Sequence, residues 1–248
     1  MVKTNQKIAV EAYNLIAKEY NNISLKNKRY IDSINTLIKD YIKCKKIIDI
    51  GSGDGKRIHN LFIESNSDEV VCIEPSRVMY NELKKYSDIR SFNILGQEKI
   101  SGFDAYFDVA TSLWNVLGHV ADKEDLDKTL SNIRDYLKPG GIFIMDVNNR
   151  LNGVSYGFLI AGYRFIIDQF FFKRSRGDVR TKWEIKEKII EGYGHVFAPF
   201  EIKSALKMNG FTLIKVKYVN YKNGRVSNNP FKGQLFIVAQ KNWIWKKF

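Results

Sequence analysis

Cysteine and histidine are scarce in this sequence, and their scarcity argues against a metal site. Only two cysteines, Cys44 and Cys72, and three histidines, His59, His119 and His195, occur among the 248 residues. None of them shows the close ligand spacing of zinc-binding motifs, so we expect no metal. Two isolated thiols are compatible with a reducing compartment.

Long apolar runs are missing as well. The N-terminus, Met-Val-Lys-Thr-Asn-Gln, lacks the apolar stretch of a secretory signal. No uncharged run reaches the roughly 18 residues that a membrane span needs. The longest aromatic-rich segment, 158–172, is interrupted by Arg164 and Asp168. We therefore expect a cytoplasmic protein without a membrane span.

Acidic residues are outnumbered by basic ones, 27 to 40, which gives a net charge of +13. Such a charge attracts polyanions, and nucleic acid is therefore one partner to consider. The lysines and arginines are scattered in short clusters, such as 43–46 and 173–176, and form no long stripe. This scattered pattern makes a small molecule the more favoured partner and nucleic acid the less favoured one.

Apolar runs alternate with amphipathic segments over the first 147 residues. The expected strands are 46–50, 69–74, 89–95, 107–113 and 142–147, and the expected helices between them are 56–65, 76–85 and 123–136. Near-continuous apolar strands are typical of a parallel sheet covered on both faces. The alternation predicts an α/β, doubly wound, Rossmann-like fold.

The flanking segments complete this fold. Residues 5–42 have the period of helices, with an interruption expected at Asn21-Asn22, and 199–208 is a further helix. Strands at 211–221 and 234–240 have no helix between them and predict an antiparallel terminal hairpin. We expect a seven-stranded, mostly parallel sheet in one domain, 1–248. Residues 150–195 are expected to form an aromatic-rich lid insertion. Its aromatic residues either pack on the sheet or on another subunit, or they line the binding site of a bulky apolar ligand.

A glycine-rich turn follows the first strand. Gly51, Gly53 and Gly55 have the spacing G-x-G-x-G, which differs from the dinucleotide fingerprint G-x-G-x-x-G and from the phosphate loop. Glycine allows the backbone to turn sharply and to approach a ligand closely. The turn therefore suits a nucleoside without a pyrophosphate, which indicates S-adenosylmethionine (SAM) and methyl transfer.

Polar residues at the ends of the strands are candidates for binding this nucleoside. Glu74 ends the second strand, and its two oxygens can accept the hydrogens of both ribose hydroxyls. Asp49 holds either the loop amides or, through water, the ligand's ammonium group, and a purely structural role as a cap of the turn is the alternative. Gln97 and Glu98, after the third strand, either lie near the adenine amine or belong to an exposed loop.

Five segments in order resemble the signatures of class I SAM-dependent methyltransferases: 49–55, 73–76, 107–113, 137–141 and 198–211. The resemblance covers about residues 8–240, and it implies SAM as cofactor. In that family the backbone around Ser112-Leu113 contacts the methionine part of SAM. The expected cofactor-binding residues are thus Tyr20, Asp49, Gly51, Ser52, Gly53, Glu74, Pro75, Gln97, Glu98, Ser112 and Leu113.

A narrower resemblance concerns residues 112–120, Ser-Leu-Trp-Asn-Val-Leu-Gly-His-Val. This segment is similar to one in small-molecule N-methyltransferases of the amino-sugar and glycine type. The resemblance implies that His119 and Tyr13 are catalytic and lie near the acceptor amine, with Tyr20 as the second choice. The expected acceptor is an amine or hydroxyl of a small molecule, and the enzyme a monomer or homodimer. An RNA or tRNA methyltransferase and a non-catalytic SAM-binding protein are the alternatives.

Several other residues are weaker candidates. His195 lies just before the late helix and is either a base in the cleft or structural, whereas His59 is expected at the surface. Asp146, Asn148 and Asn149 follow the fifth strand, where acceptors bind in doubly wound sheets. Asn148 is the candidate for acceptor binding, with a turn role as the alternative.

Overall fold

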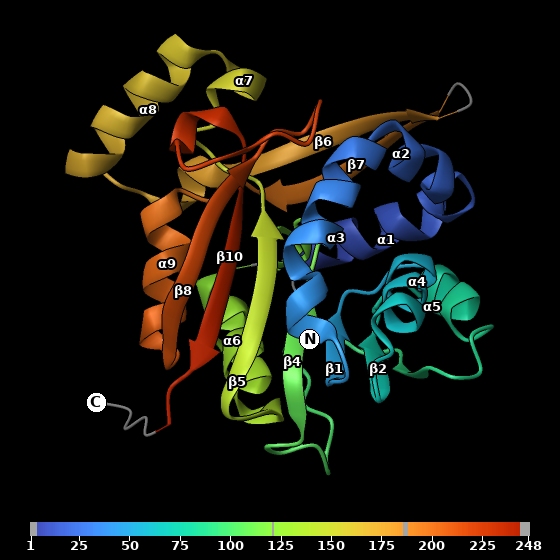
Figure 1. The fold of residues 1–248 in the computed structure, drawn as a ribbon. Coiled ribbons are helices and arrows are strands. Elements are labelled where there is room, and N and C mark those ends of the chain that lie inside the picture. Colours follow the sequence, from blue (N-terminus) through green and yellow to red (C-terminus); the bar gives the residue numbers. More distant parts are fainter. Residues whose placement is uncertain (1–3, 121, 186–187, 244–248) are drawn as a thin grey trace.

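The computed structural model describes residues 4–120, 122–185 and 188–243, and within them lies one eight-stranded sheet with the order β3-β2-β1-β4-β5-β10-β8-β9 (Figure 1). Its strands are β1 (Lys46–Ile50), β2 (Glu69–Ile73), β3 (Arg90–Phe92), β4 (Phe107–Ser112), β5 (Leu137–Val147), β8 (Phe211–Val219), β9 (Val226–Ser227) and β10 (Gln234–Lys241). The first five pair in parallel, whereas β10 is antiparallel to β5 and β8. The predicted mixed sheet and terminal hairpin are confirmed, and the short β9 is an eighth strand that the sequence did not predict.

The strand order reverses beside β1. The chain runs outward from β1 through β2 to β3, and then returns to place β4 on the other side of β1. In a doubly wound sheet this reversal opens a crevice outside the carboxyl ends of the strands. The loops after β1, β2 and β4 therefore meet at one edge of the sheet.

Helices cover both faces of the sheet (Figure 1). One face carries α3 (Lys28–Ile42), α4 (Lys56–Ser65) and α5 (Arg77–Leu83), and the other carries α6 (Lys123–Tyr136) and α9 (Pro199–Met208). Each helix presents a stripe of apolar side chains to the strands. In α3 the buried stripe is Tyr30, Ile34, Ile38 and Ile42, spaced one helical turn apart.

The junction between α6 and β5 differs from the sequence expectation, in which the fifth strand begins only at residue 142. The helix ends at Tyr136 as predicted, but β5 begins immediately at Leu137. Leu137 pairs with Phe107 and Ile142 with Val109, so the residues between them bulge from the ladder. Gly140 adopts a φ of 75° in this bulge, a conformation that glycine accommodates readily.

The N-terminal helices lie over the carboxyl edge of the sheet (Figure 1). They are α1 (Thr4–Ile16), the 3₁₀ turn η1 (Ala17–Glu19) and α2 (Tyr20–Lys26). The break predicted at Asn21-Asn22 is wrong, because both residues lie within α2 and the tighter turn precedes them. The helix α1 packs against β7 of the insertion.

The insertion after β5 contains α7 (Gly153–Tyr156), α8 (Phe158–Phe170), the 3₁₀ turn η3 (Arg174–Gly177), β6 (Asp178–Ile185) and β7 (Lys188–His195). The last two strands form an antiparallel hairpin, with Asp178 opposite His195. Two further 3₁₀ turns are η2 (Val116–His119) and η4 (Pro230–Lys232). In the part of the chain that is described, no helix is long and apolar enough to cross a bilayer.

Candidate active site

The glycine turn after β1 is folded tightly against two neighbouring loops. Gly51, Gly53 and Gly55 have φ angles of 77°, 61° and 80°, a region that side chains other than glycine rarely adopt. The amide of Gly51 donates to the carbonyl of Ile73 over 2.7 Å. A Cβ at Gly51 would lie 2.4 Å from Cγ1 of Val116, so the turn has room for glycine alone.

Glu74 joins this turn to the loop after β2. Its Oε2 accepts a hydrogen bond from the amide of Gly53 over 2.8 Å, and its Oε1 accepts one from the amide of Ser76 over 2.7 Å. Burial raises the pKa of the carboxyl to about 7. Because a carboxylate offers about four lone-pair positions, each oxygen can still accept another hydrogen.

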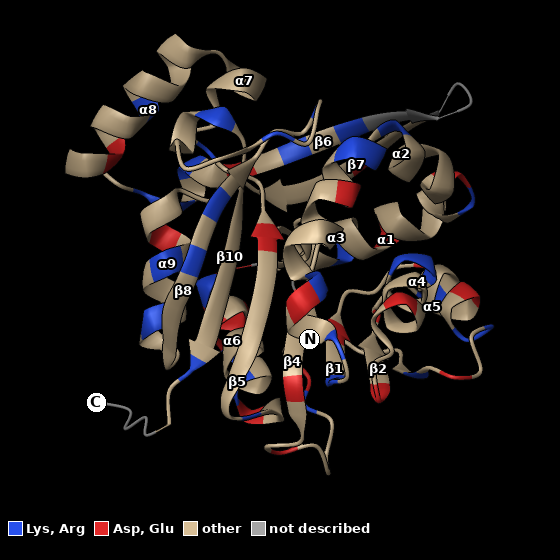
Figure 2. Ribbon diagram, in the orientation of Figure 1, with Lys and Arg blue, Asp and Glu red and all other residues tan. Residues whose placement is uncertain are grey.

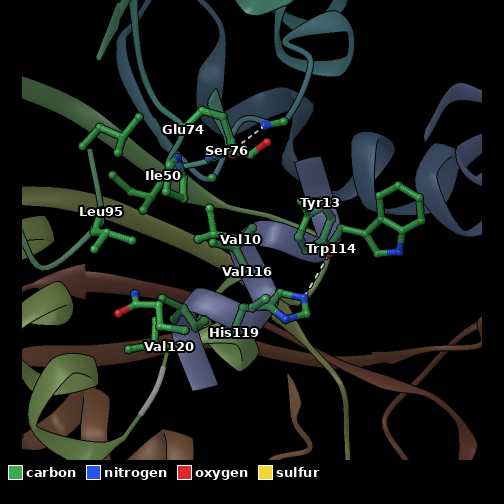
Figure 3. Close-up of a pocket in the computed structure, with 18 of the residues that line it drawn as sticks. Val10, Tyr13, Ile50, Glu74, Ser76, Leu95, Trp114, Val116, His119 and Val120 are labelled. Carbon is green, nitrogen blue, oxygen red and sulfur yellow. Dashed lines mark hydrogen bonds between the residues drawn. The ribbon is translucent and has the colours of Figure 1, made fainter. Parts of the chain in front are cut away.

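A cavity opens between these loops and α1, and we call it the loop cavity (Figure 3). Its walls are mainly apolar and include Val10, Ile50, Leu95 and Val120, with Glu74 supplying the only charge among the described lining residues. A concave, mostly apolar site with a few convergent polar groups is typical of cofactor sites. Of the expected cofactor-binding residues, the loop cavity is lined by Tyr20, Gly51, Gly53, Glu74, Pro75 and Leu113.

A second cavity adjoins the loop cavity behind the glycine turn, and we call it the turn cavity. Asp49 and Ser52, both expected at the cofactor, line it. The Oδ1 of Asp49 accepts from the hydroxyl of Thr111 over 2.5 Å, and burial raises the pKa of this carboxyl. Nearby Ser112 is fully buried, and its Oγ has no hydrogen-bond partner among the described residues.

Arg57 also lines the turn cavity, and the sequence did not predict it. Its Nε donates to Oδ1 of Asn35 over 2.9 Å, whereas its buried Nη2 has no partner within the described chain. A cation in the first turn of a helix opposes the helix dipole. This unfavourable position in α4 was the signal in the sequence that could have indicated a ligand-binding role.

Gln97 and Glu98 are both engaged within the protein. Gln97 exchanges two side-chain hydrogen bonds with Gln6 of α1, at 2.7 and 3.2 Å. The Oε2 of Glu98 accepts from the amide of Leu95 over 2.7 Å and so holds the loop after β3. Gln6 lines the loop cavity in place of the two residues proposed from the sequence.

Tyr13 and His119 come together from α1 and η2 (Figure 3). The Tyr13 hydroxyl lies 3.0 Å from Nε2 of His119, and Nδ1 of His119 lies 2.8 Å from the carbonyl oxygen of Tyr193. Because a carbonyl only accepts, Nδ1 carries the hydrogen, and Nε2 of the neutral ring accepts from Tyr13. Burial lowers the pKa of His119 and raises that of Tyr13, which keeps both groups uncharged.

A third cavity lies on the far side of this pair, and we call it the lid cavity. It shares Tyr13, Tyr20, Trp114 and His119 with the loop cavity and is closed by the insertion hairpin. Thr181 of β6 belongs to its wall, and the buried Oγ1 of Thr181 has no partner in the described chain. Among the described residues that line the loop and lid cavities, none is a lysine or arginine.

His195 lies apart from the cavities. Its ring is fully buried, with Nδ1 2.8 Å from Oδ1 of Asp178 and Nε2 3.1 Å from Oε1 of Glu201. These contacts tie the insertion hairpin to α9. His195 therefore has a structural position rather than the place of a base in the cleft.

The candidates at the end of β5 have different surroundings. The carboxylate of Asp146 accepts from the hydroxyl of Tyr30 over 2.6 Å, and Asn149 bonds the carbonyls of Pro230 and Gly233. Both are therefore structural, and only Asn148 of the three lines the lid cavity. His59 stacks on a tyrosine at the surface, as expected.

The aromatic residues of α8 line neither the loop cavity nor the lid cavity among the described residues. Their side chains are largely exposed, so this helix does not cover the sheet. Within the described chain, no group of three or more histidine, cysteine or acidic side chains could hold a metal ion.

The sheet order, the glycine turn and the acidic residue after β2 define the class I fold of SAM-dependent methyltransferases. Three solved structures of low sequence identity have this fold. A SAM-dependent methyltransferase from Clostridium acetobutylicum is 17% identical, with a TM-score of 0.65, over 93% of this chain and 99% of that one. A Thermotoga maritima protein described as a possible histamine N-methyltransferase is also 17% identical, with a TM-score of 0.64, over 94% and 99%. The DhpI–SAH complex is 14% identical, with a TM-score of 0.65, over 96% and 97%.

The chain belongs to the Methyltransferase domain family, whose model matches residues 19–216. It is a SAM-dependent methyltransferase, and SAM is its cofactor. No curated protein sequence matches this chain.

Proposed function

We propose that the protein transfers the methyl group of SAM to an amine, or to a hydroxyl, of a small molecule in the lid cavity. The observation that carries this proposal is the Tyr13–His119 pair, which lines both the loop cavity and the lid cavity. A donor in one cavity and an acceptor in the other would meet at this pair.

The described residues suit the parts of SAM. The free lone pairs of Glu74 match the two ribose hydroxyls, since its oxygens already hold the loop amides. The apolar walls suit the adenine ring. The unpaired Nη2 of Arg57 suits the carboxylate of the methionine part, and Asp49 suits its ammonium group.

SAM supplies a methyl group on a sulfonium, and a neutral thioether remains after transfer. The task of the protein is to align the acceptor and to remove its proton, and alignment alone can supply up to about 7–11 kcal/mol. In that transfer the Tyr13 oxygen would accept the proton that the acceptor nitrogen releases as it gains the methyl group. Tyr13 passes its own hydroxyl proton to Nε2 of His119, and the carbonyl of Tyr193 stabilises the resulting imidazolium through Nδ1.

The linings favour a small acceptor over RNA. A polyanion needs cations along its path, yet the described residues of the loop and lid cavities include no lysine or arginine. Basic and acidic residues are interspersed over most elements (Figure 2). The description of the Thermotoga relative as a possible histamine N-methyltransferase also supports a small amine. The amino-sugar and glycine subtypes remain part of this proposal.

The test is transfer of tritiated methyl from SAM into a cell extract fractionated by size. We expect label in the low-mass fraction with wild-type protein and with the surface variant His59→Asn, and at least 100-fold less with His119→Asn. Label in the RNA fraction would instead establish the RNA alternative. Binding of SAM without labelled product in any fraction would support a non-catalytic protein.

A further inference from the structure

The outer face of α8 is an unusual surface for a protein in water. Leu159, Tyr163, Ile166 and Phe170 are 91%, 66%, 59% and 76% exposed, and their spacing places them on one side of the helix. Phe158 and Ile160 extend this face, and Phe171 and Phe172 follow it. We call these eight residues the α8 face. Contiguous exposed apolar patches mark sites of association with a partner or a membrane.

The opposite side of α8 is anchored to the body of the protein. Ala161 and Asp168 are buried, and Oδ2 of Asp168 lies 2.8 Å from Nε of Arg150. Phe165 contacts the ring of Phe231, at a centroid distance of 6.0 Å. The helix is thus held with its apolar side outward, at a corner of the molecule remote from α4 and α5 (Figure 1).

The charge around the α8 face is mainly positive. Between residues 153 and 177 the sole acidic residue is Asp168, which is buried and paired with Arg150. Of the basic residues there, Arg174 is paired with Glu201 of α9, whereas Lys173 and Arg176 are exposed. Lys232 follows Phe231 beside the helix and is exposed. A face of apolar side chains bordered by cations is complementary to a surface of anionic phospholipid.

We propose that the α8 face docks the enzyme on an anionic phospholipid membrane, with α8 lying in the plane of the interface. Thirteen residues of helix span only about 20 Å, so α8 lies on the bilayer and does not cross it. A second copy of this chain is the less suitable occupant. A two-fold contact through α8 would bring Lys173, Arg176 and Lys232 of two copies together, with no exposed acidic residue between 153 and 177 to offset them, in a chain of net charge +13.

Co-sedimentation of the full chain with vesicles tests the proposal. One set of vesicles is phosphatidylcholine alone, and the other contains about a third phosphatidylserine. We expect partition into the anionic vesicles to exceed that into the neutral ones and to fall as salt is raised. The double variant Leu159→Ser/Ile166→Ser should reduce partition at least tenfold, because two large apolar side chains no longer enter the interface.

The matched control is Ile63→Ser on α4, which removes an equally exposed isoleucine (61%) elsewhere and should leave partition unchanged. Because the replaced side chains are exposed, the affinity for S-adenosylhomocysteine should remain normal and show that the variants are folded. Any of three partition results would overturn the proposal: no partition into either vesicle, equal partition into both, or full binding by the double variant. A dimer in ultracentrifugation that dissociates in the double variant would overturn it in favour of a second copy. Each of these results is independent of the identity of the methyl acceptor.

Discussion

Replacing Glu74 by glutamine should change the number of protons released when the nucleoside binds. With a pKa of about 7, the buried carboxyl of the ligand-free protein is half protonated at pH 7. Ribose hydroxyls that donate to both oxygens favour the carboxylate, so binding should expel about half a proton.

The same raised pKa means that the folded protein holds this proton more tightly than the unfolded chain. Its free energy of unfolding therefore falls as pH rises from about 4.5 to about 7.

The affinity should fall together with the proton release. In Glu74→Gln an amide NH₂ must face the amide of either Gly53 or Ser76, so that a donor meets a donor. A hydrogen bond to a charged group contributes about 1.5–3 kcal/mol, so we expect a loss on the order of 2 kcal/mol, or about thirtyfold in Kd.

Calorimetry with S-adenosylhomocysteine at pH 7 measures both quantities. Phosphate and Tris differ in ionisation enthalpy, so titrations in both buffers give the number of protons released per ligand bound. Protons released by the ligand itself contribute equally to the wild type and the variants, so they drop out of the difference. Glu124→Gln on the exposed side of α6 is the control and should match the wild type. Equal proton numbers in Glu74→Gln and wild type, or unchanged affinity, would refute the ribose role of Glu74.

Three further substitutions test the turn, the base and the anchor of α8. His119→Asn should lower kcat at least 100-fold with little change in SAM affinity. Because burial lowers the pKa of this histidine, the wild-type kcat should stay constant as pH is lowered to about 6.5 and decline only below that value. A kcat that already declines while the pH is still above about 6.5 would contradict the role of His119 as a base. Gly51→Ala should abolish nucleoside binding, because the added Cβ would clash with Val116. Gly102→Ala is the control, since Gly102 has a φ of 85° but an added Cβ would meet no atom within 4 Å, and it should cost only about 1–2 kcal/mol of stability. Equal effects of the two variants in binding and melting assays would show that the contact between the glycine turn and Val116 is unimportant. Asp168→Ala should lower the free energy of unfolding by about 3–5 kcal/mol, since it leaves Arg150 buried and unpaired, and adding Arg150→Met should restore part of it in denaturant titrations.

The parts of the fold and site that the sequence predicts are local in the chain. The glycine turn and Glu74 each follow directly from a strand end, and the order of strands brings those ends to one edge. Asn21 and Asn22 illustrate the limit of such reasoning, because α2 continues through both residues despite their low helix propensity.

The remaining parts depend on distant segments. The Tyr13–His119 pair joins residues 106 apart, and only the family resemblance indicated it. Thr181 becomes relevant because the insertion hairpin folds back over the Tyr13–His119 pair, which no local pattern encodes. The aromatic residues of α8 have the same sequence period whether the helix is buried or exposed, so only the structure reveals that its face is open.

A crystal structure with bound S-adenosylhomocysteine tests the central claim most directly. We expect the nucleoside in the loop cavity, with both ribose hydroxyls within hydrogen-bond distance of Glu74 and the sulfur facing the Tyr13–His119 pair. A nucleoside bound elsewhere, or one whose ribose lies away from Glu74, would contradict the account.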